Sequence, residues 1–573
     1  MIDPKYSTLQ GLFADRVFRI PHYQRFYSWK KKQREDLFSD LRKLIQTAED
    51  QHHFMATVVC HKTAEINSIG TAQYRLYDIV DGQQRLTTLI LMLKCIELDL
   101  AEGTDDRQEL GRILVKRDGH LILLQTNNLN QHIFNRFIRE GVAPTKAEIT
   151  NYSDENLLDA ISDCQKFLAS WKLTRAPLDL MRLILHRLGF VVYDTEDGRV
   201  VYTLFEVLNS RGLAVDWLDK TKSVLMGKAY ELAQSPAAQQ AEIEALQNIW
   251  AQIYNEIAKQ DIPGDEILRI TATLYYGPGH GKPRPADDSL ELLRSECKVA
   301  NSPTQISTRL LGVATKLSEL YGNVQLGAVT DILQARLLAV AIKSAAGVSE
   351  PERQKLLEQW ERVSFRIFGL YGKDSRAKVG DYVRIGYKIM TSDIETRTYN
   401  QIMNQLHELG SDFPIGEAVE VGLAGKDFYE SPDACRYLLW NYEEYLASKA
   451  GAAATFDEHE RSAIWKERAS DSIEHVFPQT PGHGWETKMQ NPQTGEELTL
   501  AHHVSRIGNL ILLPIVLNSE AKALPFAQKK LIYAKHNLRM VHEVVTNDDW
   551  GYDMIVARES DLLNWAKVRW ADI

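Results

Sequence analysis

The sequence predicts an α+β fold that is predominantly helical and has three parts. Strand-like and helical runs alternate over residues 1–230, apolar spacings of three and four dominate the middle, and two short apolar strands accompany a polar cluster near residue 475. At 573 residues the chain is also too long for a single hydrophobic core. We therefore expect an N-terminal α/β domain at 1–230, a helical connector at 231–415 and a C-terminal domain at 416–573.

The first part is expected to be mixed α/β. Residues 74–80 are rich in aromatic and β-branched side chains and predict a strand. The pair Asp81-Gly82 predicts a turn, and residues 86–100 predict a helix whose leucines and isoleucine fall on one face. Residues 54–60 and 189–194 predict two further strands.

The middle part is expected to be mostly helical from residue 217 to 409, with clear helical spacing at 241–257 and 332–342. Glycine and proline predict loops at 277–285 and 410–414. The first loop is not a P-loop, because three residues separate Gly277 from Gly281 where four are required, and Pro283 follows the lysine.

Composition narrows the class of protein. The net charge of −10 opposes a simple DNA-coating role, although residues 16–43 carry a local balance of +6 and residues 362–388 one of +5. Those stretches fit either DNA contacts or ordinary solvated surfaces. The five cysteines are scattered, which argues against a disulfide framework or a structural zinc site and favours a reducing cytoplasm. No signal peptide and no apolar run of membrane-spanning length are present, so we expect no membrane partner.

The polar cluster near the C-terminus predicts a nuclease. Glu474 and His475 lie on an expected strand at 473–476, Asn509 precedes a second strand at 510–513, and Asn518 falls where a helix would begin. This is the order of a ββα-metal nuclease: His475 is the expected general base, Glu474 and Asn518 the ligands of Mg²⁺ or Mn²⁺, and Asn509 the brace of the histidine. Each feature alone is an ordinary dipeptide or turn, and only the ordered set predicts the site.

A second polar cluster predicts a phosphate site in the first part. At the expected strand-to-helix turn, Gly82 permits close backbone approach, and Arg85 with the hydroxyls of Thr87 and Thr88 would contact phosphate. There Asp81 would hold a metal, and Gln83 or Gln84 would position a water. The alternative interpretation is that Asp81 and the glutamines after it only cap the helix and bind no phosphate. Two more segments could contribute polar side chains to this phosphate site. The segment 20–29 offers Tyr23, Gln24 and Arg25, and the segment before an expected helix end at Gly212 offers Asn209 and Arg211.

Taken together, these motifs resemble those of the GmrSD-type modification-dependent (type IV) restriction endonucleases, including BrxU-like and SspE-like phage-defence proteins. The N-terminal resemblance rests on IPHYQRFYSW at 20–29, DGQQRLTTL at 81–89 and FEVLNSRG at 205–212. The C-terminal resemblance rests on IEHVFPQ at 473–479, IGNLILLP at 507–514, and Asn518. Many relatives carry Asp before the catalytic histidine, where this chain has Glu474.

The resemblance implies a ParB-like nucleotide-hydrolysing domain followed by an HNH-like nuclease domain. Its nucleotide would be GTP or ATP with Mg²⁺. The residues implied to bind or hydrolyse it are Tyr23, Gln24, Arg25, Asp81, Gly82, Gln83, Gln84, Arg85, Thr87, Thr88, Asn209 and Arg211. The implied catalytic set is His475 and Asn509, with Glu474 and Asn518 at the metal. The implied substrate is double-stranded phage DNA bearing glucosylated hydroxymethylcytosine or lying next to phosphorothioate marks.

The function expected from sequence is therefore a nucleotide-regulated, metal-dependent DNA endonuclease of anti-phage defence in the cytoplasm. A homodimer would allow double-strand breaks with one nuclease site per chain. The alternative is a nucleotide-dependent DNA-binding regulator whose nuclease domain is vestigial. Intact Glu474, His475, Asn509 and Asn518 argue against that alternative.

Overall fold

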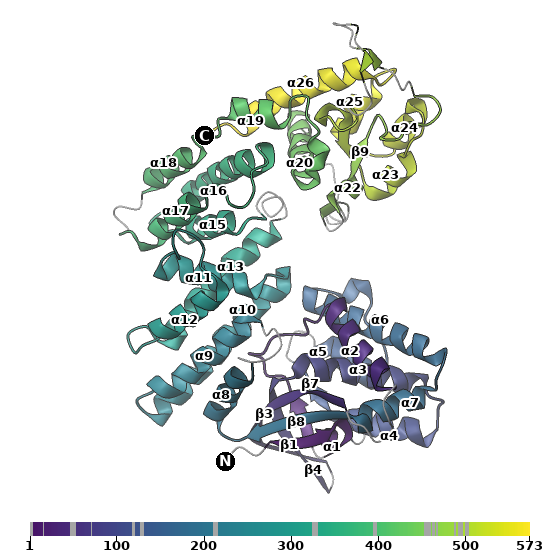
Figure 1. Ribbon diagram of the computed structural model, residues 1–573, viewed down its shortest axis with the longest axis vertical. Coiled ribbons are helices and arrows are strands. Elements are labelled where there is room, and N and C mark those ends of the chain that lie inside the picture. The colour runs from purple at the N-terminus through teal and green to yellow at the C-terminus, as the bar shows by residue number, and fades with distance from the viewer. Residues whose placement is uncertain are drawn as a thin grey trace. The chain divides into compact units, whose positions relative to one another are not determined.

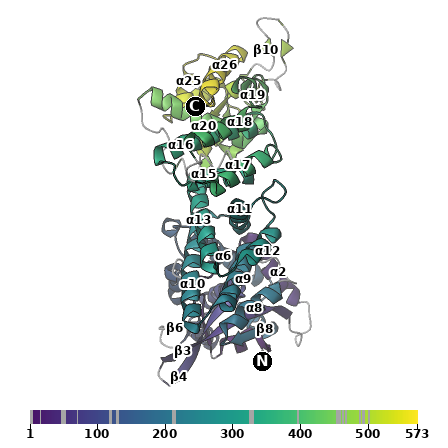
Figure 2. The ribbon, with the colours of Figure 1, turned by 90° about the vertical axis from the view of Figure 1, so that its left-hand side faces the viewer.

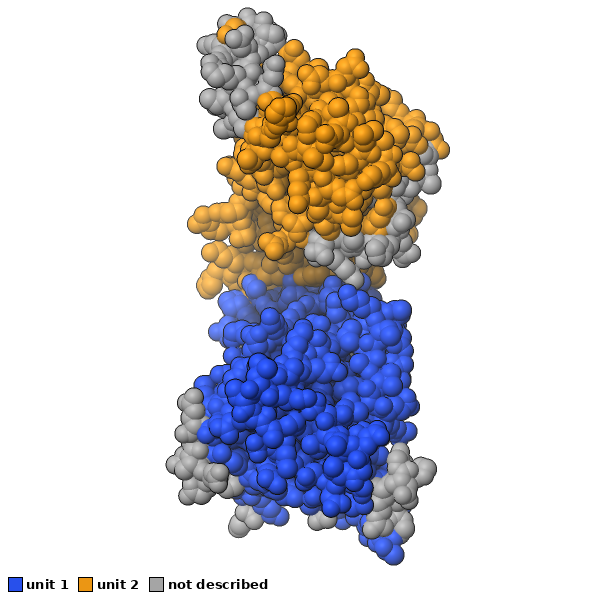
Figure 3. Space-filling model, turned by 90° about the vertical axis from the view of Figure 1, so that its right-hand side faces the viewer, with its two compact units in different colours: residues 1–272, 285–318 blue, residues 273–284, 319–573 orange. Residues whose placement is uncertain are grey.

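The computed structural model describes residues 4–14, 16–45, 53–69, 71–116, 121–126, 131–209, 216–323, 331–393, 398–451, 460, 464–465, 468–485, 489–490, 495, 497–498 and 503–573. The chain forms two compact units (Figure 3). Unit 1 comprises residues 1–272 and 285–318, and unit 2 comprises residues 273–284 and 319–573. Helices predominate in both, and unit 1 also holds a mixed sheet, which confirms the expected helix-rich α+β class. The expected domain boundaries near 230 and 415 stay predictions.

The sheet of unit 1 combines parallel and antiparallel neighbours (Figure 1). Within the described residues its six strands lie in the order β1-β8-β3-β4-β2-β7. They are β1 (Lys5–Thr8), β2 (Arg16–Arg19), β3 (His53–Ile69), β4 (Ala72–Asp81), β7 (Leu124–Gln125) and β8 (Leu188–Thr195), and a separate pair is formed by β5 (Val115–Lys116) and β6 (Leu121–Ile122). The central strand β3 is parallel to β8 and antiparallel to β4. The strands expected at 54–60, 74–80 and 189–194 are confirmed in β3, β4 and β8.

Helices cover both faces of this sheet. Successive residues of a strand point to opposite faces, so Val58 and Cys60 of β3 join the main core while Val59 joins a smaller one. The smaller core is closed by Val201 and Phe205 of α8, which lies next to β3, β4 and β8 (Figure 2). Helix α3 runs through the main core, where every residue from Leu86 to Ile96 is buried. The helix expected at 86–100 is thus confirmed, but it is buried on all sides and not on one face only.

The helices of unit 1 account for most of its length. They are α1 (Leu9–Phe13), α2 (Lys31–Leu44), α3 (Gln83–Asp99), α4 (Asp105–Leu114), α5 (Gln131–Glu140), η1 (Lys146–Glu148), α6 (Tyr152–Lys172), α7 (Pro177–Arg182), η2 (Leu183–Arg187), α8 (Gly198–Asn209), α9 (Trp217–Leu232), α10 (Pro236–Gln260) and α12 (Ala286–Glu296). The chain passes into unit 2 within α11 (Gly264–Tyr276), returns to unit 1 between Arg284 and Pro285, and passes into unit 2 again within α13 (Pro303–Gly322). The helix expected at 241–257 lies in α10, and the loop expected at 277–285 separates α11 from α12.

An apolar core joins Phe365 and Leu370 to residues between 418 and 570 of unit 2, which is built mostly from helices. They are α15 (Leu333–Ser344), α16 (Glu350–Ser364), η3 (Phe365–Leu370), α17 (Val379–Thr391), α18 (Tyr399–Gly410), α19 (Ile415–Gly422), η4 (Phe428–Glu430), α20 (Pro432–Lys449), α22 (Ala469–Ser472), η6 (Ile507–Asn509), α23 (Ile515–Ala521), α24 (Phe526–Tyr533), α25 (Arg539–Val545) and α26 (Tyr552–Arg569). The helix expected at 332–342 and the loop expected at 410–414 are confirmed. Along the described part of the chain, no helix has the length and apolar character needed to cross a bilayer.

Two short strands carry the C-terminal motifs. Strand β9 (Ile473–His475) pairs antiparallel with β12 (Leu510–Leu512), and His475 lies opposite Leu510. Both expected strands are confirmed, and Asn518 lies in α23, which follows β12 directly. A separate pair is formed by β10 (Met489–Gln490) and β11 (Glu497–Leu498).

Helix α26 holds the turn that precedes β12. A Cβ atom on Gly508 would lie 2.0 Å from the carbonyl oxygen of Ile555, so only glycine allows the helix to approach this closely. Arg558 on the same helix donates from Nη1 to the carbonyls of Gly508 (2.9 Å) and Leu510 (2.8 Å). The Gly508-Asn509 turn is therefore fixed from outside the two-stranded sheet.

Candidate active site

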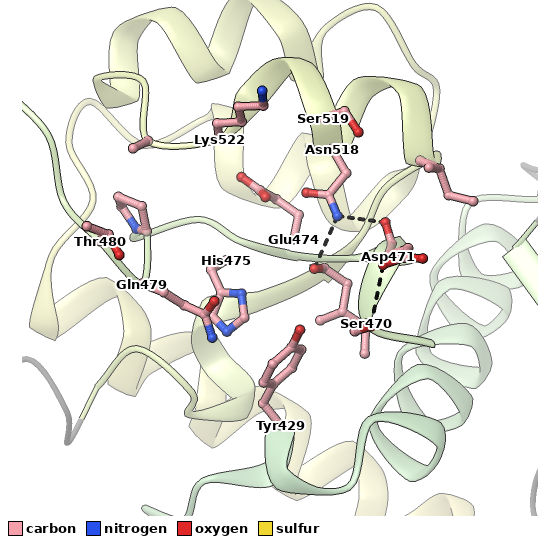
Figure 4. A pocket seen from close by; sticks show the side chains of 14 residues that line it. Tyr429, Ser470, Asp471, Glu474, His475, Gln479, Thr480, Asn518, Ser519 and Lys522 are labelled. Atoms are coloured by element: carbon pink, nitrogen blue, oxygen red, sulfur yellow. Dashed lines mark hydrogen bonds between the residues drawn. The ribbon is translucent and has the colours of Figure 1, made fainter. Parts of the chain in front are cut away.

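A cavity of about 570 Å³ opens beside β9 and α23 in unit 2. Glu474, His475 and Asn518, three residues expected from the sequence, line it together (Figure 4). Tyr429 and Lys522 lie on opposite sides of the same cavity. Residues that are 43 positions apart in the chain (475 to 518) thus meet in one place, as the nuclease hypothesis requires.

His475 has the properties of a general base. Its ring is buried and packs edge-on against Tyr429, with the ring centres 4.5 Å apart. Its Nε2 atom has no hydrogen-bond partner among the residues that the structure describes. Burial, together with the nearby Lys529 ammonium, lowers the pKa of His475 to about 4. At neutral pH the imidazole is therefore uncharged, and it can accept a proton.

Asn509 braces the backbone next to His475. Its Nδ2 donates to the carbonyls of Phe477 (2.9 Å) and Val504 (2.8 Å), and its Oδ1 accepts from the Phe477 amide (2.8 Å) and the Trp550 indole (2.9 Å). With both ends of its amide engaged and its side chain fully buried, Asn509 reaches His475 only through the chain. Its assignment as the brace of the catalytic histidine stays a prediction, and this geometry fits it.

Asn518 is oriented by the strand segment that carries Glu474 and His475. Its Nδ2 donates to the carbonyls of Asp471 (2.8 Å) and Ile473 (3.3 Å). Because the nitrogen is engaged in this way, Oδ1 is turned into the cavity, towards Glu474 (Figure 4). An amide oxygen held in this direction can act as a metal ligand.

Glu474 has two partners on helix α24 that the sequence motifs did not reveal. Its Oε1 accepts from Lys529 Nζ (2.6 Å) and from the Tyr533 hydroxyl (2.7 Å). The lysine, which is fully buried, also donates to the His475 carbonyl (2.7 Å). Burial raises the pKa of Glu474 and lowers that of Lys529. The sequence signal is the spacing of four between Lys529 and Tyr533, which places both on one helix face.

The side chains in the cavity fit a divalent cation. Glu474, Asn518 and the carboxylate of Asp471 offer the hard oxygen atoms that Mg²⁺ and Mn²⁺ prefer. Among the described residues no three His, Cys, Asp or Glu side chains gather into a cluster. Mg²⁺ needs no such cluster, because it commonly uses one or two carboxylates, waters and substrate phosphate.

The residues expected to bind nucleotide gather in unit 1 at the start of α3. Gly82 caps this helix in a left-handed conformation (φ 93°), and the Asp81 carboxylate accepts from the Gly82 amide (2.8 Å). Arg85 lies about one helical turn after Asp81, close to that carboxylate and over the ring of Trp29. Burial raises the pKa of Asp81 and lowers that of Arg85. Gln83 is buried, and its Oε1 has no hydrogen-bond partner within the described ranges.

Several of these polar side chains have partners within the fold. The Gln84 amide donates to the Phe26 carbonyl (2.7 Å) and accepts from the Ser28 amide (2.9 Å), which ties the segment 20–29 to α3. The hydroxyls of Thr87 and Thr88 each donate to the carbonyl four residues earlier (2.8 Å). Asn209 is the last residue of α8, and Arg211 lies outside the described residues. The nucleotide-binding roles of all these residues stay predictions.

Helix α9 adds charged residues that the motifs did not include. Lys222 is buried and donates to Gln24 Oε1 (2.6 Å), and Arg25 pairs with Asp216 (3.1 Å) and Asp219 (3.4 Å). Burial lowers the pKa of Lys222 to about 8, although Asp219 opposes the shift. Tyr23 is buried nearby, and burial raises the pKa of its hydroxyl. A compact polar network thus links residues 23–25 to α9.

The basic stretch at 16–43 is largely neutralised by acidic partners. Its pairs within unit 1 are Arg16–Asp194, Arg19–Asp78, Arg25–Asp216, Lys30–Asp261, Lys31–Glu35, Lys32–Asp36, Arg34–Asp163 and Lys43–Asp40. Such pairing favours an ordinary surface over a DNA-binding patch in this stretch.

Comparison with models of known protein families shows to which family the chain belongs. The model for the N-terminal domain of GmrSD restriction endonucleases matches residues 9–226, and the model for their C-terminal domain matches residues 414–565. The chain belongs to the GmrSD restriction endonuclease family. A search of curated proteins found no match. The two GmrSD domains support a restriction-nuclease role, and such an enzyme has DNA as its substrate.

The C-terminal GmrSD match contains the residues of the candidate site and those that hold them. Glu474, His475, Asn509 and Asn518 all fall within residues 414–565, as do Lys529 and Tyr533. The N-terminal match contains residues 23–25, 81–88 and 222. Each polar network therefore lies inside one matched domain.

Proposed function

We propose that this GmrSD-family protein is a nucleotide-regulated, divalent-metal-dependent endonuclease that cleaves modified foreign DNA in anti-phage defence. In this proposal the C-terminal domain is HNH-like and the N-terminal domain is ParB-like. The observation that carries it is the buried, uncharged His475, which lines one cavity with Glu474 and Asn518 and whose Nε2 has no partner among the described residues.

In the proposed reaction, His475 accepts a proton from the water that attacks the scissile phosphate. Asn509 and Lys529 hold the backbone at and just after His475, through the Phe477 amide and the His475 carbonyl. A divalent cation bound by Glu474 and Asn518 would offset the charge on the phosphate and on the leaving 3′ oxygen. Tyr429 packs against the ring and limits its rotation.

The proposal is tested by digesting DNA substrates of defined modification. We expect cleavage of phage DNA carrying glucosylated hydroxymethylcytosine or phosphorothioate in the presence of Mg²⁺ or Mn²⁺, none with EDTA, and weaker cleavage of the unmodified matched DNA. Each reaction is run with GTP, with ATP and without nucleotide. DNA binding without cleavage in every reaction would contradict the nuclease and favour a regulator with a vestigial nuclease domain.

The nucleotide half of the proposal is supported by the network at the start of α3. Arg85 and the Gly82 backbone stand at a helix N-terminus, where anions bind favourably. The buried Lys222 adds a cation near this turn, because it donates to Gln24 Oε1 while Gln24 Nε2 donates to the carbonyl of Val80, two residues before Gly82.

Replacing Arg85 by alanine is expected to lower the rate of phosphate release from GTP or ATP at least tenfold, because a charge-assisted contact to phosphate is removed. Arg112→Ala, on the exposed face of α4, is the matched control and should hydrolyse nucleotide at the wild-type rate. Unchanged turnover in a folded Arg85→Ala protein would show that the turn at 81–85 is only a helix cap.

A further inference from the structure

The backbone at Lys522 adopts a conformation that residues with a Cβ atom rarely adopt. This residue ends α23 with φ 40° and ψ −127°. The two other non-glycine residues of positive φ that flank helices in the described chain, Asp261 and Lys378, have ψ of 44° and 18° and so lie near the ordinary left-handed region. Glycine would fit position 522 without strain and is common just after a helix.

The strained residue also lines the cavity that holds His475. Among the described non-glycine residues of positive φ, which are Asp261, His280, Lys378 and Lys522, only Lys522 belongs to this cavity. Its exposed side chain lies across the cavity from Tyr429 (Figure 4). Strain of this kind persists only where the surrounding structure enforces it, and it gathers at functional sites.

Lys522 differs from the nearby lysines because its side-chain ammonium has no partner within the described residues, although its backbone amide donates to the Asn518 carbonyl. Lys529 binds Glu474, Lys530 donates to the Asn547 carbonyl, and Lys535 pairs with Glu520. A cation without a partner, at the rim of a cavity whose substrate is a polyanion, is suited to contact phosphate.

We propose that Lys522 contacts a backbone phosphate of the DNA beside the scissile phosphate and positions the strand over His475. This inference rests on the proposed nuclease function. A phosphate contact carries no sequence information, so Lys522 contributes equally to the binding of modified and unmodified DNA.

The test measures DNA binding at several salt concentrations in a His475→Ala background, which prevents cleavage during the measurement. Lys522→Ala and Lys522→Gly should each weaken binding roughly five- to tenfold at 0.1 M salt and lower the slope of log K against log salt by about 0.9, the value for one phosphate contact. Lys522→Arg should retain most of the binding. Lys535→Ala is the matched control, and its slope should stay at the wild-type value.

The Lys522→Gly variant distinguishes the effect of the lysine charge on DNA binding from the effect of the backbone strain on stability. Lys522→Gly should melt at a temperature equal to or a few degrees above that of the wild type, because the strain is relieved, while its DNA binding falls. A lower melting temperature together with unchanged binding would overturn the inference, since the lysine would then serve only the fold.

The two proposals fail in different ways. If wild-type protein cleaves DNA while the Lys522 variants bind and cleave as it does, only the role of Lys522 is overturned. If wild-type protein neither binds nor cleaves DNA, the nuclease function is overturned, and the role of Lys522 with it.

Discussion

Replacing His475 by alanine is expected to lower the rate of DNA cleavage by about 10²- to 10⁴-fold, the range typical for loss of a general base. The imidazole is uncharged at neutral pH and its Nε2 has no partner among the described residues, whereas Glu474 is paired with Lys529 and Tyr533. Cleavage is followed under single-turnover conditions with Mg²⁺ or Mn²⁺, and DNA binding is measured in parallel. Binding should remain close to the wild-type value.

The matched control is His483→Ala, which removes an exposed histidine from the same domain. His475→Gln keeps most of the ring volume against Tyr429 and guards against a loss that arises from packing alone. Full cleavage by a folded His475→Ala protein would contradict the assignment of the base. A loss of cleavage restored by His475→Gln would assign the residue a packing role.

Replacing Lys529 by methionine is expected to destabilise unit 2 by about 3–5 kcal/mol, the range for breaking a buried ion pair. The methionine fills a similar volume, but it leaves Glu474 buried without its cation and leaves the His475 carbonyl without its donor. The free energy of unfolding is measured by urea denaturation in the presence of EDTA, so that no metal replaces the lysine.

The control is Lys535→Met, which breaks the exposed pair with Glu520 and should cost under about 1 kcal/mol. The double variant Glu474→Gln with Lys529→Met should recover part of the stability, because no unpaired charge remains. If the Lys529→Met protein has a free energy of unfolding no lower than that of Lys535→Met, the buried Glu474 does not need the lysine as a partner.

Local patterns predicted the elements that carry the site. Residues 74–80 are rich in aromatic and β-branched side chains, residues 86–100 have helical apolar spacing, and the structure has β4 and α3 there. Period alone could not show that α3 is buried on every side, since that depends on which elements pack around it. The helix expected to begin at Asn518 begins three residues earlier, after Pro514, whose fixed φ favours a helix start.

The contacts made over long sequence separations could not be predicted from local patterns. Lys529 lies 55 residues after Glu474, and Lys222 lies 198 residues after Gln24. The spacing of four places Lys529 and Tyr533 on one helix face, but nothing local shows that this face meets a buried carboxylate and not solvent. The same reason hid Tyr429, which reaches His475 from a different part of the chain.

One consequence follows from the way Asn518 is held. Its amide nitrogen is bonded to backbone carbonyls of the segment that continues into Glu474 and His475. His475 and the Asn518 amide oxygen are thus coupled through a single stretch of peptide, so small helix displacements change their separation little. In the proposed active site, these side chains therefore need little rearrangement when a substrate binds. They are already held in place once the protein has folded.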